Sequence, residues 1–182
     1  MQAGRLIVLE GTEGAGKTTQ LRLLADRLEA SGRHVLTLRE PGGTPLGDAI
    51  RTILLDSADE MTAEAEALLF MASRAEIVRL RIDPALRDGV IVLMDRFFLS
   101  TYAYQIAGRG LDERQIREAN AIATGGRVPD LTIVIDVPPA DGLTRAAARG
   151  QQDRMERSGD DFHSKVSSAF SLYTTDEWQR AH

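Results

Sequence analysis

The amino-acid sequence predicts an α/β fold in which helices cover both faces of a parallel sheet. Four short apolar runs, rich in β-branched residues, alternate along the chain with segments of helical periodicity. These runs are nearly continuous in apolar residues, which is typical of parallel strands buried on both faces. With 182 residues, of which 43% are hydrophobic, the chain can bury a substantial core, and we expect residues 1–182 to form one domain.

The expected strands and the first helices follow from apolar spacing. The strands are residues 6–9, 35–38, 90–94 and 131–137. After the first strand, apolar residues keep one helical face from Leu21 to Leu28, and Gly32 supplies a stop signal. A second helix is expected over residues 46–54.

Capping signals mark the later helices. A long helix is expected over about residues 62–80, and Asp83-Pro84 indicates a cap and first-turn proline for a short helix before the third strand. Asp112 and Gln115 resemble a capping box, and Gly125-Gly126 closes the helix that it opens.

Composition excludes several classes of function. The net charge of −5, from 22 basic and 27 acidic residues, gives no overall basic field, so we expect no nucleic-acid partner. The absence of cysteine excludes disulfides and thiolate metal sites and suits a reducing compartment. The N-terminal apolar run is too short for a signal peptide or a membrane span, so we expect a cytoplasmic protein without membrane attachment.

The strongest functional signal is GTEGAGKT at residues 11–18, which matches GxxxxGK[ST] in full between an expected strand and an expected helix. The glycines let backbone N–H groups surround phosphates, Lys17 reaches the terminal phosphates, and Thr18 can ligate Mg²⁺. The alternative, a glycine-rich turn with a solvated lysine, is disfavoured by the complete motif. The nucleotide-binding candidates are Gly11, Thr12, Glu13, Gly14, Ala15, Gly16, Lys17, Thr18 and Thr19.

Two expected strands end in an aspartate, and either aspartate is a candidate for the magnesium-side carboxylate. Asp95 is followed by Arg96, which places an acid and a guanidinium where open α/β sheets bind their ligands. Asp136 is followed by a valine and two prolines, a combination typical of a strand terminator. The sequence therefore favours Asp95 for chemistry and Asp136 for a structural role.

Other arginines suggest a second ligand pocket. Arg39 follows the second strand in LREPGGTPLG, a rigid loop from which a guanidinium can bind a phosphate in bidentate fashion. Arg74 lies four residues after Phe70, so the two share a helical face that could stack on and hydrogen-bond a base. The alternative is a core Phe70 and a solvated Arg74, which helix statistics alone favour.

Six segments occur in the order and spacing of thymidylate kinases: GTEGAGKT (11–18), REPGGT (39–44), LLFMASRAE (68–76), DRFFLSTYAYQ (95–105), IDVPP (135–139) and DRME (153–156). The chain therefore resembles this family as far as about Tyr173. The resemblance implies a three-layer α/β/α P-loop nucleoside-monophosphate-kinase fold. It also implies a bacterial-type enzyme that uses ATP and Mg²⁺ to phosphorylate thymidine monophosphate, in dTTP biosynthesis.

The resemblance assigns the phosphate end of the site. Lys17 keeps its role on the donor phosphates, and Arg39 and Arg96 would hold the acceptor phosphate. Asp95 and Arg96 would lie near the metal and the transferring group. Ser100 is a weaker substrate-binding candidate in the same segment.

The resemblance also assigns the nucleoside end. Phe70 would stack on thymine, and Arg74 with Thr101 or Gln105 would read the polar edge of the base. Tyr104 would crowd the 2′ side of the sugar and so favour deoxyribose.

Two positions of the phosphate loop carry further implications of the resemblance. Glu13 would face the 3′-hydroxyl of the acceptor, the alternative being a solvated side chain at a variable position. At Gly14 some family members carry an arginine, so the stabilising charge would come from a lid over about residues 145–160. Arg149 and Arg154 are favoured there over Arg145 and Arg157, and the alternative is a solvated arginine-rich loop.

At its C-terminal end the sequence departs from the family pattern. A stripe at Phe162, Val166, Phe170 and Tyr173 predicts a helix, but the strand and helix expected after Trp178 are absent. Either the sequence is truncated, or the protein has a four-stranded sheet in which strand 131–137 lies at or near an open edge. Family members are typically homodimers, so the apolar faces around residues 46–55 and 62–80 are candidate interfaces.

Three functional hypotheses stay open from the sequence. The first is a thymidine monophosphate kinase, and the second is another nucleotide or deoxynucleoside kinase. The third is a P-loop regulatory NTPase without a small-molecule acceptor. The REPGGT loop, Phe70 with Arg74, and the DRFFLSTYAYQ segment favour a kinase, because together they indicate a second pocket.

Overall fold

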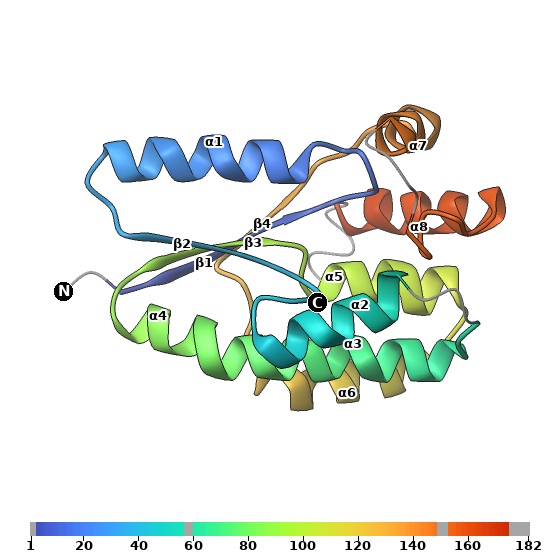
Figure 1. The fold of residues 1–182 in the computed structure, drawn as a ribbon, viewed down its shortest axis with the longest axis horizontal. Helices are drawn as coiled ribbons and strands as arrows, with labels where there is room; N and C mark the ends of the chain where they lie inside the picture. The colour runs from blue at the N-terminus through green and yellow to red at the C-terminus, as the bar shows by residue number, and fades with distance from the viewer. Residues whose placement is uncertain (1–2, 57–59, 149–152, 175–182) are drawn as a thin grey trace.

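The computed structural model describes residues 3–56, 60–148 and 153–174. At its centre lies a parallel sheet in the order β2-β3-β1-β4 (Figure 1). The strands are β1 (Arg5–Glu10), β2 (Val35–Arg39), β3 (Ile91–Asp95) and β4 (Leu131–Val134). All four predicted strands are therefore confirmed, and their parallel pairing is the expected one.

The strand predicted over residues 131–137 was too long, because β4 ends at Val134. The backbone N–H of Ile135 still donates to Glu10 O at 2.8 Å, but the two prolines after Val137 have no N–H groups with which to continue the ladder. Leu131 and Ile133 are exposed, and β4 is an edge strand among the described residues. Its alternating burial differs from the continuous burial of the inner strands, as expected for an edge.

Helices cover both faces of the sheet (Figure 1). Helix α1 (Lys17–Ala30) packs on one face, where Leu21 and Ala25 join Leu9 and Leu93 in a small core. The opposite face is covered by α2 (Pro45–Asp56), α3 (Ala63–Ile77), α4 (Asp83–Arg87) and α6 (Glu113–Thr124). The three predicted layers are confirmed.

Of the two predicted helix starts with a capping signal, one is confirmed and the other is wrong. Asp112 accepts from Gln115 N and caps α6 as predicted. Helix α3 begins close to its predicted start, where the Thr62 side chain accepts from Ala65 N. The long helix does not end at Leu80. It continues through a π-helical segment, η1 (Val78–Ile82), directly into α4, so Asp83 is not a cap. The wider turn just before Pro84 suits a residue that lacks an N–H group.

A second π-helical segment carries part of the candidate site. Helix α5 (Phe98–Thr101) passes into η2 (Tyr102–Gly108), where the Arg109 N–H donates to Tyr104 O, five residues earlier, at 2.9 Å. Turns of this kind occur frequently at functional sites because they change the direction of the side chains that follow.

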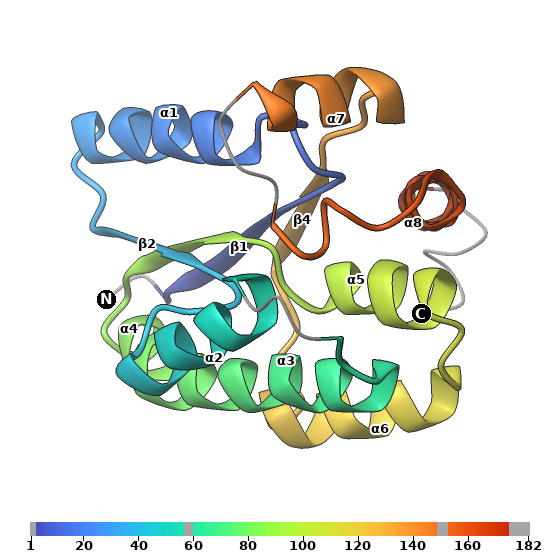
Figure 2. The ribbon, with the colours of Figure 1, turned by 45° about the vertical axis from the view of Figure 1, so that its right-hand side comes forward.

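The last helices are α7 (Pro139–Ala147) and α8 (Asp160–Tyr173). Helix α7 lies beside the loop between β1 and α1 (Figure 2). The predicted stripe of α8 is confirmed, since Phe162, Val166, Phe170 and Tyr173 are all buried. No helix within the described ranges is long and apolar enough to cross a membrane.

Candidate active site

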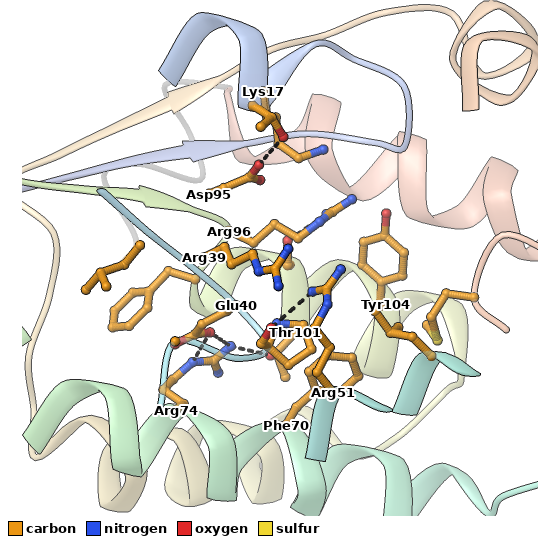
Figure 3. A pocket seen from close by; sticks show the side chains of 18 of the residues that line it. Lys17, Arg39, Glu40, Arg51, Phe70, Arg74, Asp95, Arg96, Thr101 and Tyr104 are labelled. Carbon is orange, nitrogen blue, oxygen red and sulfur yellow. Dashed lines mark hydrogen bonds and ion pairs between the residues drawn. The ribbon is translucent and has the colours of Figure 1, made fainter. Parts of the chain in front are cut away.

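A cavity of about 620 Å³ opens at the carboxyl ends of β1, β2 and β3 (Figure 3). Open α/β sheets bind ligands at this edge. Its wall contains most of the residues that the sequence singled out: Glu13, Lys17, Thr18, Arg39, Phe70, Arg74, Asp95, Arg96, Ser100, Thr101, Tyr104 and Gln105. The phosphate loop and the predicted second pocket therefore share one cavity.

The phosphate loop has the backbone that its glycines allow. Gly14 and Gly16 have φ values of 67° and 94°, and a Cβ on Gly14 would lie 1.9 Å from the carbonyl oxygen of Gly142 in α7. The Thr12 hydroxyl is buried without a hydrogen-bond partner among the described residues, as expected of a loop that binds a polar ligand. These features fit a triphosphate.

Lys17 points into the loop rather than into solvent. Its Nζ donates to Gly11 O at 3.0 Å and to Thr12 O at 2.6 Å, and the side chain is buried. Burial, with the neighbouring Arg96, lowers the pKa of Lys17 to about 7. The alternative of a solvated lysine is wrong for this structure.

Thr18 and Asp95 meet in the cavity, although 77 residues separate them in sequence. Thr18 Oγ1 donates to Asp95 Oδ2 at 2.7 Å. These are the hard oxygen ligands that Mg²⁺ prefers, and Mg²⁺ needs few of them because it keeps waters and phosphate oxygens. Among the described residues no group of three or more His, Cys, Asp or Glu side chains could hold a metal alone. Asp136 is exposed beyond the end of β4 and is not among the residues that line the cavity.

Arg96 occupies the turn after β3 with φ 70°, unusual for a residue other than glycine. Its Nη1 donates to Gly11 O at 3.0 Å and to Ser100 Oγ at 2.9 Å. Buried Glu10 holds this turn by accepting from the N–H groups of Phe97 and Ser100 and from the Ser100 hydroxyl. Sequence reasoning missed Glu10, although an acid at the end of an apolar strand was a signal for it. Ser100 lines the cavity, but its hydroxyl is bonded to these two side chains.

Glu13 does face the second pocket. The Tyr104 hydroxyl donates to Glu13 Oε1 at 2.5 Å, and Arg96 lies 3.4 Å from the same oxygen and stacks on the Tyr104 ring. Although burial alone would raise it, the pKa of Glu13 is held below its ordinary value by Arg96, Tyr104 and Lys17. With 10% of its side chain exposed, Glu13 is not the solvated residue of the alternative interpretation.

Arg74 is fully buried, so the alternative in which it is solvated is wrong. Its Nε and Nη2 donate to Glu40 Oε2 at 2.9 and 2.7 Å, and Nη2 also donates to Thr101 Oγ1 (Figure 3). Nη1 donates to Asn120 Oδ1 at 3.0 Å. Glu40 Oε1 is buried with no partner among the described residues. Phe70, one helical turn before Arg74, is half-buried and lines the cavity.

Arg39 and Arg51 form a cationic wall above Phe70 (Figure 3). Arg51 Nη1 donates to Pro41 O at 3.0 Å. Burial and then the nearby charge of Arg39 lower the pKa of Arg51, so these guanidiniums are close enough to repel each other. An anion between them would relieve this repulsion. Arg51 lies on α2 with no motif of its own, and sequence reasoning missed it.

The lid arginines have different surroundings. Arg145 on α7 and Arg157 are exposed. Arg154 pairs with Glu66 Oε2 at 2.7 Å and donates from Nε to Leu54 O at 2.8 Å. Arg149 lies outside the described residues.

Comparison with known proteins agrees with this geometry. A family model described as Thymidylate kinase matches residues 9–180. The chain belongs to the thymidylate kinase family. It is 51% identical over 170 residues to the thymidylate kinase of Deinococcus radiodurans, covering 93% of this chain and 82% of that protein. For the thymidylate kinase of Thermomicrobium roseum the identity is 55% over 161 residues, covering 88% and 76%.

A third relative, the thymidylate kinase of Pseudomonas fluorescens Pf0-1, is 47% identical over 175 residues, covering 96% of this chain and 83% of that protein. Family membership confirms the resemblance of the six motifs and the P-loop kinase fold that it implies. The match begins at Leu9, so it includes the whole phosphate loop of this thymidylate kinase family member.

Proposed function

We propose that this chain transfers the γ-phosphoryl group of ATP to thymidine monophosphate, giving ADP and thymidine diphosphate, a step in dTTP biosynthesis. The observation that carries the proposal is the single cavity in which a phosphate loop faces a second pocket across Asp95 and Arg96. A kinase needs donor and acceptor phosphates aligned in one water-poor space.

On the donor side, ATP lies along the phosphate loop, residues 11–19, with Lys17 at its terminal phosphates. Thr18 and Asp95 would hold Mg²⁺, whose charge neutralises the oxygens of the donor. The protein supplies the cradle and the orientation of these two ligands.

On the acceptor side, an oxygen of the thymidylate phosphate attacks the γ-phosphorus as the bond to the ADP oxygen breaks. No general base is needed, because the phosphate oxygen is already ionised. Arg96 stands between the two phosphates, and Arg39 and Arg51 hold the acceptor phosphate from the other side. Arg149 and Arg154 stay our candidates for a lid arginine that stabilises the transferring group.

The nucleoside end of the cavity selects the acceptor. Phe70 stacks on the thymine ring, and Arg74 with Thr101 or Gln105 reads its polar edge. Glu13 accepts from the 3′-hydroxyl, and it repels a phosphate at that position. Tyr104, fixed by its bond to Glu13, crowds the 2′ side of the sugar.

We further propose a cytoplasmic homodimer. Leu46 and Ile53 on α2 and Leu68 on α3 are about half exposed or more, at 51%, 48% and 64%. They lie on the helices where the sequence predicted an interface, and a second copy would cover them.

A coupled ADP-release assay with thymidine monophosphate tests the proposal, with the other nucleoside monophosphates and the nucleosides as competing acceptors. We expect ADP release that depends on thymidine monophosphate and falls at least about 100-fold in Arg96→Ala and Arg74→Ala. Slow hydrolysis unaffected by any monophosphate would instead support the regulatory NTPase.

A further inference from the structure

Glu66 is a buried carboxylate that binds three side chains from two parts of the chain, Gln105 and Arg109 at η2 and Arg154 before α8. It lies in the first turn of α3 with 1% of its surface exposed. Oε1 accepts from Gln105 Nε2 at 2.9 Å and from Arg109 Nε at 3.2 Å. Oε2 accepts from Arg109 Nη2 at 3.1 Å and pairs with Arg154 Nη2 at 2.7 Å. None of the six family-like motifs includes Glu66.

An ionised carboxylate only accepts hydrogen bonds. Although burial alone would raise it, the pKa of Glu66 is held below its ordinary value by Arg109, Gln105 and Arg154, so Glu66 is ionised at neutral pH. The Gln105 amide must therefore turn its NH₂ group toward Glu66. The opposite orientation would set the amide oxygen against a carboxylate oxygen within 3 Å.

This orientation determines what Gln105 presents to a ligand. Gln105 lines the same cavity as Phe70 and Arg74. With one N–H of its amide donated to Glu66, Gln105 turns its carbonyl oxygen Oε1 away from that carboxylate and can offer Oε1 to a base. Oε1 is an acceptor, so it matches a ring N–H and opposes a ring nitrogen that carries a lone pair.

We propose that Glu66 is a positioning residue that sets the base selectivity of the kinase by fixing the Gln105 amide. The inference rests on the proposed function, since it concerns the same acceptor pocket. Thymine and uracil carry a hydrogen on N3, whereas N3 of cytosine is an acceptor. A fixed Oε1 therefore favours the first two bases and excludes cytosine, because a buried polar mismatch is strongly disfavoured.

The alternative is that Glu66 only ties α3 to η2 and to Arg154 as a structural ion pair. The two roles differ in one observable, the discrimination between bases. Glu66→Gln replaces the acceptor-only carboxylate by an amide that can also donate, so Gln105 is free to turn. Arg109→Met is the matched control, because it removes an arginine from Glu66 and leaves the bond to Gln105.

The experiment measures kcat/KM for thymidine monophosphate and for deoxycytidine monophosphate in the full chain. We expect the ratio of the two values to fall at least about tenfold in Glu66→Gln and less than about threefold in Arg109→Met. Glu66→Asp, which keeps an acceptor-only group, should retain more of the ratio than Glu66→Gln. A folded Glu66→Gln variant with an unchanged ratio, or an equal fall in Arg109→Met, would overturn the inference.

If Glu66→Gln does not fold, the wild-type chain still tests the inference. Thymidine monophosphate methylated at N3 has lost the hydrogen that Oε1 would accept, so its KM should rise at least about 30-fold. An equal KM for the two substrates would refute the fixed acceptor. Both arms require that the wild-type chain turns over thymidine monophosphate, and failure of that reaction refutes the proposed function instead.

Discussion

The protonation state of Lys17 makes nucleotide binding depend on pH in a predictable direction. In the ligand-free cavity, burial and Arg96 lower the pKa of Lys17 to about 7. A bound triphosphate replaces the lost hydration with negative charge, which favours the protonated ammonium and raises this pKa again. Above pH 7 the free protein is therefore mostly neutral at Lys17, and ATP binding takes up a proton.

The magnitude follows from the pKa of about 7 and the linkage of binding to protonation. At about pH 8, roughly a tenth of the free protein carries the charged lysine, so binding should take up about 0.9 proton per ATP. The affinity should be about tenfold lower than for the fully protonated protein, which is about 1.4 kcal/mol. Ionisation of ATP itself contributes little to this proton uptake, because its phosphates are already ionised at this pH.

Isothermal titration calorimetry of ATP binding at about pH 8, in two buffers with different ionisation enthalpies, counts the protons directly. Lys17→Arg is the control, because a guanidinium keeps its charge throughout this range and should show no uptake. Uptake below about 0.3 proton in the wild type, or the same uptake in Lys17→Arg, would refute the reasoning.

Two further predictions concern stability and the phosphate loop. Arg74→Met leaves the Glu40 carboxylate buried without its partner and should lower the free energy of unfolding by about 3–5 kcal/mol in urea denaturation. The double variant with Glu40→Gln should recover part of this loss, and an additive loss would contradict the pairing. Gly14→Ala forces a Cβ against Gly142 O at a positive φ, so kcat/KM should fall at least about tenfold. Gly159→Ala, whose Cβ meets nothing within 4 Å, should leave kcat/KM unchanged.

Signals confined to a few neighbouring residues predicted most of the fold. The apolar runs located all four strands, the helix expected from about residue 62 begins at Ala63, and the capping box at Asp112 located the start of α6. The errors fell where neighbouring structure decides the boundary. The strand predicted over residues 131–137 ends early because β4 pairs with one strand among the described residues and is followed by prolines. The helix before Asp83 continues because a π-helical turn accommodates Pro84.

The site was predictable where a motif names its residues and not where partners are distant in sequence. The phosphate loop and the Asp95-Arg96 pair could be found directly. No local pattern indicates that Glu10 meets Ser100 across 90 residues, or that Arg74 is neutralised by Glu40. A buried arginine and a solvated one have the same helical spacing, so the difference depends on the carboxylate that the fold brings to it.

The π-helical segment η2 also constrains the length of the chain at this point. A π-turn differs from an α-helical turn by one extra residue, and η2 contains Gln105 and leads into Arg109, which both donate to Glu66. Deleting one residue from positions 106–108 would restore an α-helix and rotate Arg109 by about 100° relative to Gln105. In related sequences this segment should therefore vary in residue type more readily than in length. Neither its composition nor its apolar pattern distinguishes it from an ordinary helix.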